Sequence, residues 1–102
     1  HGTAAPLPRG RPVIERQATI VNQEGLHARP AARIVRLAST FESEIELVKD
    51  GLDVNGKSIM GVMMLAAECG SSIIIRATGP DAEQAVQALA ELVASGFGET
   101  IA

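Results

Sequence analysis

Aromatic side chains are scarce in this chain of 102 residues. Phe41 and Phe97 are the two aromatic residues, and the chain has no Trp or Tyr. Proteins that bind single-stranded nucleic acid stack bases on aromatic rings. The net charge of −3 is also a poor electrostatic match for DNA or RNA. We therefore expect no nucleic-acid partner, and a core built from Ile, Leu, Val, Met and Ala.

Cysteine and histidine are also rare. Cys69 has no second cysteine with which to form an internal disulfide, and we expect it to be a small core residue. Two histidines are too few for a His/Cys zinc site, so we expect neither a metal nor another cofactor. The sequence has no run of membrane-spanning length and does not open with a signal sequence, which favours a cytoplasmic protein without membrane contact.

The first twelve residues differ in composition from the rest. Residues 1–12 contain three prolines and two glycines and lack apolar periodicity, which predicts a flexible lead-in. The chain starts with His1 instead of Met, so this segment is interpreted as a cloning remnant or as a piece of something longer, and His1 is left out of the candidate site. We expect one domain over 13–98 and a short tail over 99–102.

Hydrophobic periodicity predicts an α+β fold. Alternating apolar residues indicate strands, and apolar residues three or four apart indicate helices. Asp50 and Gly51 predict a hairpin turn, so at least one strand pair is antiparallel. With helices on one face of the sheet, the order of elements favours a two-layer sandwich. The expected strands are 14–21, 44–49, 52–54 and 72–78, and the expected helices are 28–39, 58–67 and one that starts near Asp81 and closes at Gly96 and Gly98.

The segment GLHARPA, residues 25–31, places His27 at the mouth of the first helix. Unpaired backbone N–H groups and the positive helix end favour an anion there. A neutral imidazole in this position has a lone pair that can attack phosphorus, and Arg29 can stabilise the charge that arrives. Pro30 falls in the first turn, where its missing N–H does little harm. Taken by itself, this spacing favours a histidine that merely caps a helix.

The second helix has more apolar surface than one core contact can bury. Helical spacing places Val62, Leu65, Ala66 and Cys69 on the core face. Exposed methionines suit a surface that adapts to several partners, although loops can cover some of them. Ser58 is the expected N-cap, and a phosphate on its hydroxyl would add charge beside these residues. The side chains directed away from the core are those of Ile59, Met60, Met63 and Met64.

With these residues in view, the chain resembles the histidine-containing phosphocarrier (HPr) family of the bacterial phosphotransferase system. The resemblance runs from about Val13 to Gly98 and rests on two motifs. Residues 25–31 are similar to the active-site segment of the family, and Lys57 to Met63 are similar to its regulatory-serine helix. It implies an open-faced sandwich in which three helices cover one face of a four-stranded antiparallel sheet.

The resemblance also implies a function and a set of partners. His27 would accept a phosphoryl group on Nδ1 from phosphorylated Enzyme I and pass it to an enzyme IIA in sugar transport. Arg29 would contact the phosphoryl group, and the HPr kinase/phosphorylase would modify Ser58. The protein would be a monomeric covalent carrier instead of a stand-alone enzyme. The apolar docking patch for partners would comprise Ile59, Met60 and Met63.

Three other interpretations stay open from the sequence. The chain is also compatible with a carrier of the nitrogen-related phosphotransferase branch, with a domain of a multidomain phosphotransferase protein, and with a binding module that uses the helix patch without phosphorylation. The presence of His27 argues against the last. Glu24 departs from family members that have a neutral residue there, and it either weakens phosphoryl stabilisation or points to solvent.

Overall fold

The computed structural model describes residues 12–102, so most of the expected lead-in lies outside the described residues. The elements alternate as the hydrophobic pattern predicts, and the four strands form one antiparallel sheet in the order β1-β4-β2-β3. The expected fold class is therefore confirmed. In chain order the elements are β1 (Ile14–Thr19), α1 (Ala28–Ala38), β2 (Glu44–Lys49), β3 (Leu52–Asn55), α2 (Ile59–Met64), β4 (Ser72–Thr78), α3 (Ala82–Ala94) and a short 3₁₀ turn, η1 (Gly96–Gly98).

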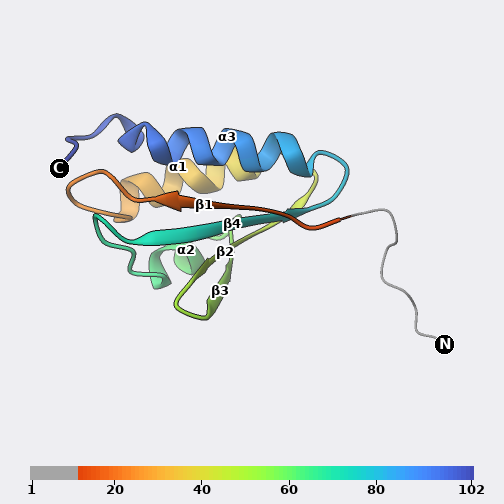
Figure 1. Ribbon diagram of the computed structural model, residues 1–102, viewed down its shortest axis with the longest axis horizontal. Helices are drawn as coiled ribbons and strands as arrows, with labels where there is room; N and C mark the ends of the chain where they lie inside the picture. The colour runs from red at the N-terminus through yellow and green to blue at the C-terminus, as the bar shows by residue number, and fades with distance from the viewer. Residues whose placement is uncertain (1–11) are drawn as a thin grey trace.

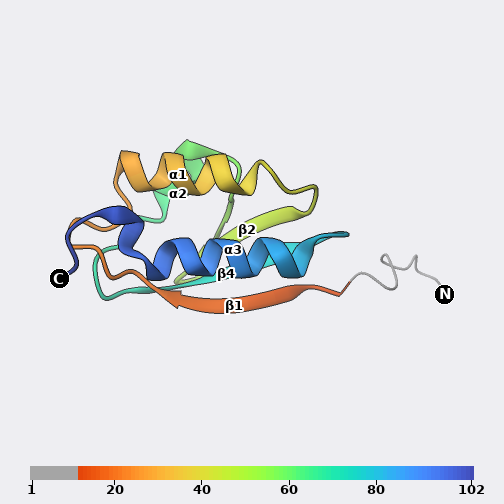
Figure 2. The ribbon, with the colours of Figure 1, turned by 90° about the horizontal axis from the view of Figure 1, so that it is seen from above.

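The three helices cover one face of the sheet. In β2, Leu47 lies opposite Val54 of β3 and Ile75 of β4, so three buried side chains form a row across the sheet. Helices α1 and α3 run beside each other over this face, and α2 packs against α1 and β3 (Figures 1 and 2). The apolar face of α3 is buried as expected, at Ala82, Ala85, Val86, Leu89 and Val93.

The opposite face of the sheet carries a row of charged side chains. Arg76 of β4 lies between strands β1 and β2, and its guanidinium contacts Glu15 at 2.7 Å and Glu46 at 3.2 Å. Asp53 of β3 lies 3.6 Å from the same group. These ion pairs raise the pKa of Arg76, chiefly through the hydrogen bond to Glu15 and then that to Glu46. A row of charged side chains is typical of a sheet face that stays in water.

Turn residues determine where two elements begin. Asp50 and Gly51 both have positive φ angles, 51° and 81°, which is the conformation that a tight hairpin requires. Asp81 is the N-cap of α3, as expected, but its carboxylate makes no capping hydrogen bond. It accepts instead from the backbone N–H of Glu42 at 2.9 Å and from the Ser43 hydroxyl at 2.6 Å. Asp81 therefore joins α3 to the segment that leads into β2.

The second helix is shorter than predicted, and two of its expected core residues are exposed. Helix α2 ends at Met64, and Ala66 has a φ of 50°, which no α-helix permits. This turn brings Ala67 into the core and leaves Ala66 and Cys69 exposed. The prediction that Cys69 is a core residue is therefore wrong, because helical spacing does not continue to position 69.

The last residues pair with the segment after β1. All three residues of η1 have positive φ angles, and this turn reverses the chain after α3. Thr100 O then accepts from Gln23 N at 2.8 Å, and Val21 O accepts from Ala102 N at 3.1 Å. The expected tail, residues 99–102, is thus bound to the domain, and we call it the C-terminal strap. The C-terminus lies at the end of the molecule that also carries the β1–α1 loop (Figure 1).

Candidate phosphoryl-carrier site

His27 is the N-cap of α1, as the sequence predicts. Its backbone is extended, and its carbonyl accepts the first helical hydrogen bond, from Ala31 N at 3.0 Å. The imidazole makes no capping hydrogen bond, and 36% of the side chain is exposed. The ring nitrogens are therefore not used to cap the helix. The ring is accessible to a partner at the positive end of the helix dipole.

The loop before His27 is held by backbone contacts. Gly25 has a φ of 71°, and a Cβ atom at this position would lie 2.6 Å from the carbonyl O of Ala67. The same carbonyl accepts a 2.9 Å hydrogen bond from Leu26 N, while the Leu26 side chain is buried in the core. Glycine is thus required before Leu26, because a side chain there would press on the acceptor that fixes the loop.

Glu99 contacts the imidazole, although no local sequence pattern predicts this contact. Both carboxylate oxygens of Glu99 lie 3.0 Å from His27 Nε2. The hydrogen bond with His27 is the main cause that holds the pKa of Glu99 below its ordinary value, with smaller contributions from Asn22 and from the charge of Arg29. Glu99 is therefore an ionised hydrogen-bond acceptor beside the ring. Its side chain is 17% exposed.

Asn22 holds this carboxylate in place. The Asn22 side chain is fully buried, and its Nδ2 donates to Gly25 O at 2.8 Å and to Glu99 Oε1 at 3.1 Å. Because both partners are acceptors, the amide orientation is determined. Among the described residues, the buried Oδ1 of Asn22 has no hydrogen-bond partner. Asn22, Glu99 and His27 form a continuous polar chain from the interior to the surface.

Arg29 and Glu24 lie at the rim of the same hollow. This hollow is lined by His27, Arg29 and Glu99 together with Gln23, Glu24, Gly98 and Thr100. The Glu24 carboxylate lies 3.9 Å from His27 Nε2, but its side chain is 77% exposed. Glu24 therefore points mainly to solvent, whereas the exposed Arg29, the second residue of α1, supplies positive charge within the first turn of the helix.

Ser58 and the apolar side chains of α2 occupy a separate place. The Ser58 hydroxyl accepts a 3.1 Å hydrogen bond from Gly61 N, which confirms the expected N-cap. Val62 and Leu65 are buried against the core. The outward side chains form the expected apolar surface, which we call the α2 patch: Ile59, Met60, Met63 and Met64, with Met60 the most exposed at 75%.

The family model described as "PTS HPr component phosphorylation site" matches residues 14–95, which include both motifs. The chain belongs to the HPr family. Membership in this family of the phosphotransferase system supports a general role as a phosphoryl carrier.

Relatives and solved structures agree with this membership. The phosphocarrier protein HPr of Cupriavidus necator is 46% identical over 87 residues, covering 85% of this chain and 98% of the relative. The phosphocarrier protein NPr of Shewanella violacea is 40% identical over 86 residues, covering 84% and 94%. The crystal structure of HPr from Thermoanaerobacter tengcongensis has a TM-score of 0.82 at 46% identity, covering 86% of this chain and 99% of that one.

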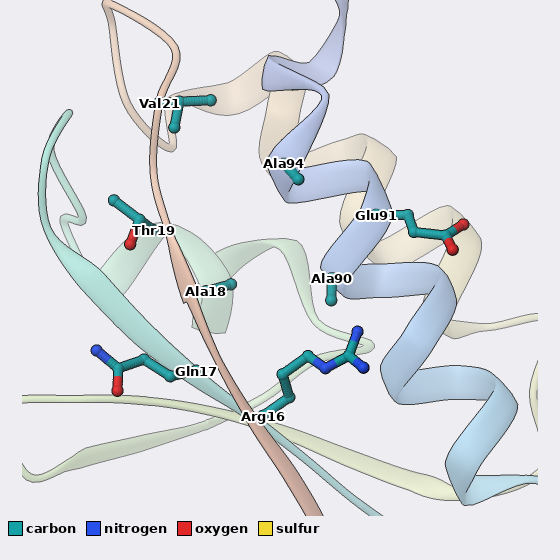
Figure 3. Close-up of a pocket in the computed structure, with 8 residues that line it drawn as sticks. All are labelled: Arg16, Gln17, Ala18, Thr19, Val21, Ala90, Glu91 and Ala94. Atoms are coloured by element: carbon teal, nitrogen blue, oxygen red, sulfur yellow. The ribbon is translucent and has the colours of Figure 1, made fainter.

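Other surface features of this HPr-family chain lie apart from His27. A hollow between β1 and α3 is lined by small residues, among them Ala18, Ala90 and Ala94, together with the long side chains of Arg16, Gln17 and Glu91 (Figure 3). It shares no lining residue with the hollow at His27.

No helix in the described part of the chain is long and apolar enough to cross a membrane. Residues 12–102 contain no group of three or more potential metal ligands.

Proposed function

We propose that His27 receives a phosphoryl group from phosphorylated Enzyme I and passes it to an enzyme IIA of the sugar branch. The observation that carries this proposal is the partly exposed imidazole at the N-terminus of α1, in one hollow with Arg29. The helix N-terminus favours the arriving negative charge, and the planar guanidinium of Arg29 is suited to phosphoryl oxygens. An acceptor in this position needs no resident cofactor.

Each transfer is an in-line displacement at phosphorus, so positioning and charge stabilisation are the main tasks of the protein. His27 supplies the nucleophilic nitrogen, Nδ1. Gly25 and Leu26 fix the loop that presents the ring, through the contacts with Ala67. Because the N–P bond stays reactive, the phosphoryl group moves on to the next acceptor.

A charging experiment tests the proposal. The full chain is incubated with Enzyme I and phosphoenolpyruvate, and the product is analysed by intact-mass spectrometry before and after brief acid treatment. We expect one acid-labile phosphoryl group on the wild-type chain and none on His27→Ala. His1→Ala is the matched control, because it removes the other histidine and should be charged normally. Normal charging of His27→Ala would refute the assignment.

We also propose that Ser58 is phosphorylated by the HPr kinase/phosphorylase. Its hydroxyl lies at the start of α2, beside Ile59 and Met60, so a phosphate would add negative charge next to the α2 patch. With the kinase and ATP, Ser58→Ala should lose the modification. Ser95→Ala is the control, because Ser95 also accepts a hydrogen bond at a helix start, from Phe97 N. A phosphate that mass spectrometry maps elsewhere would contradict the proposal.

The nitrogen-related branch is the second candidate, because one relative is named phosphocarrier protein NPr, at 40% identity. A relative named phosphocarrier protein HPr is more similar, at 46% identity, which supports the first candidate. Initial charging rates with the Enzyme I of each branch separate the two. Faster charging by the sugar-branch Enzyme I is the expected result, and faster charging by the nitrogen-branch enzyme would reverse the assignment.

A further inference from the structure

We infer that Glu99 is a positioning residue: it holds the ring proton of His27 on Nε2 and so leaves the lone pair of Nδ1 free to attack phosphorus. This inference rests on the proposed transfer at His27. It assigns a task to the C-terminal strap, whose turn and pairing bring Glu99 to the ring.

The chemistry of the pair determines which ring nitrogen carries the proton. A neutral imidazole carries one proton, and the nitrogen without it holds the lone pair. An ionised carboxylate is only an acceptor, so the group facing it at 3.0 Å must donate. The nitrogen facing Glu99 is Nε2, so Nε2 carries the proton. A carboxylate that fixes the tautomer and orientation of a histidine has the same task in the Ser-His-Asp triad.

The surrounding contacts keep the carboxylate in the required place. Asn22 donates to Glu99 Oε1 from the buried side. Thr100, the next residue of the strap, accepts a 2.8 Å backbone hydrogen bond from Gln23 N. Gly96 allows a close approach of the strap, because a Cβ atom there would collide with the Ile101 side chain. Glu99 is thus fixed by partners on both sides of it, independently of His27.

With the proton on Nε2, the transfer step conserves bonds, electron pairs and protons. The lone pair of His27 Nδ1 forms the N–P bond while the bond from phosphorus to the donor's leaving atom breaks, and that electron pair leaves with the donor. The ring keeps its Nε2 proton and becomes positively charged, facing the Glu99 carboxylate. In the onward transfer the N–P electron pair returns to Nδ1, and the neutral ring is restored without a net proton movement. Glu99 keeps the proton on Nε2 of the phosphorylated ring, so that the ring leaves phosphorus as a neutral imidazole and not as an anion.

The tautomer of the ring tests this inference directly. The full chain is labelled with ¹⁵N, and the two ring nitrogens of His27 are assigned by NMR at a pH where the ring is neutral. We expect a single Nε2–H tautomer in the wild-type protein and a mixture in Glu99→Ala. Glu99→Gln should restore the single tautomer, because its amide oxygen also accepts. Glu24→Gln is the matched control: it removes the other nearby carboxylate and should leave the tautomer unchanged.

Charging by Enzyme I gives a second readout. Since a charged hydrogen bond to the ring is lost, Glu99→Ala should be charged about tenfold more slowly than wild type. Glu83→Gln, which changes an exposed carboxylate of α3 outside the hollow at His27, should keep the wild-type rate. A wild-type ring that is a tautomer mixture or carries Nδ1–H, or a Glu99→Ala ring unchanged from wild type, would overturn the inference while charging at His27 still stands. Failure of the wild-type chain to be charged would refute the proposed function instead, whatever the tautomer.

Discussion

Arg33 Nη1 donates a 2.7 Å hydrogen bond to the carbonyl O of Phe97, which joins the exposed side of α1 to the turn after α3. Phe97 has a φ of 59°, an unfavourable backbone conformation for a residue with a side chain, and its ring is buried in the core. The Arg33 contact and the buried ring together hold η1 in the shape that directs Glu99 toward His27.

Removing this contact should loosen the strap. We expect Arg33→Ala to lower the free energy of unfolding by about 1 kcal/mol, because one hydrogen bond from a charged group is lost. Amide exchange should speed up for residues 96–102 more than for the sheet. Arg36→Ala is the control, because Arg36 is an exposed arginine of the same helix. Equal exchange of the strap in both variants would show that Arg33 does not anchor it.

Gly25→Ala should destabilise the loop before His27. The variant acquires the cost of a left-handed alanine, about 1 kcal/mol, and also a Cβ atom 2.6 Å from the Ala67 carbonyl O. Gly70→Ala separates the two effects, because Gly70 has a φ of 91° and nothing within 4 Å of its Cβ position. In urea unfolding we expect Gly25→Ala to lose clearly more stability than Gly70→Ala. Similar losses of stability in the two variants would mean that the loop can move away from the added Cβ atom without further loss of stability.

Local sequence patterns were sufficient for most of the fold. Strands β2 and β4 have the predicted bounds, because alternation at Ile45 and Leu47 and at Ile73 and Ile75 matches burial on one sheet face. The α1 helix ends one residue earlier than expected. The apolar periodicity does not predict the end of α2 at Met64, because the left-handed backbone of Ala66 interrupts the helical spacing. No side-chain pattern indicated that an alanine would adopt this conformation.

No local sequence pattern predicts the contact between His27 and Glu99. The two residues are 72 positions apart, and nothing in their local patterns links them. A signal does exist in the two glycines on either side of Phe97, which mark a left-handed turn followed by an acid. The sequence pattern identifies these glycines only as the end of the last helix, because the direction in which the chain leaves that turn depends on tertiary contacts such as Arg33 with Phe97.

Asp81 should make stability depend on pH in the acid range. The Ser43 hydroxyl, and then the backbone N–H of Glu42, hold the pKa of Asp81 below its ordinary value of 3.8. The folded protein therefore binds fewer protons than the unfolded chain, so this stabilisation is complete above that value and is lost as the pH falls through the lower folded pKa.

Urea unfolding from pH 5 down to about pH 2.5 measures this dependence. Asp81→Asn should flatten it, and Ser43→Ala should flatten it partly, because that variant removes the main hydrogen bond. Glu99, whose pKa is also lowered, chiefly by its hydrogen bond with His27, should maintain a residual slope in the Asp81 variant. A slope identical to that of wild type would contradict the assigned role of Asp81.

The α2 patch should affect partner binding without affecting the fold. Met60→Gln replaces the most exposed apolar side chain and should change the free energy of unfolding by less than about 0.5 kcal/mol. The KM of Enzyme I for the variant should rise, because the apolar contact is lost. Leu52→Gln is the matched control, since Leu52 is an exposed apolar residue on β3 outside the patch. An equal rise in KM for both variants would argue against docking at α2.

The central claim is that His27 carries a phosphoryl group in transit. The most direct measurement charges the full chain with Enzyme I and phosphoenolpyruvate, isolates it at alkaline pH, maps the phosphate by fragmentation mass spectrometry, and then adds an enzyme IIA. We expect one phosphoryl group on His27 that leaves the chain when the enzyme IIA is added and appears on that protein. A phosphate on another residue, or one that stays on the chain, would contradict it.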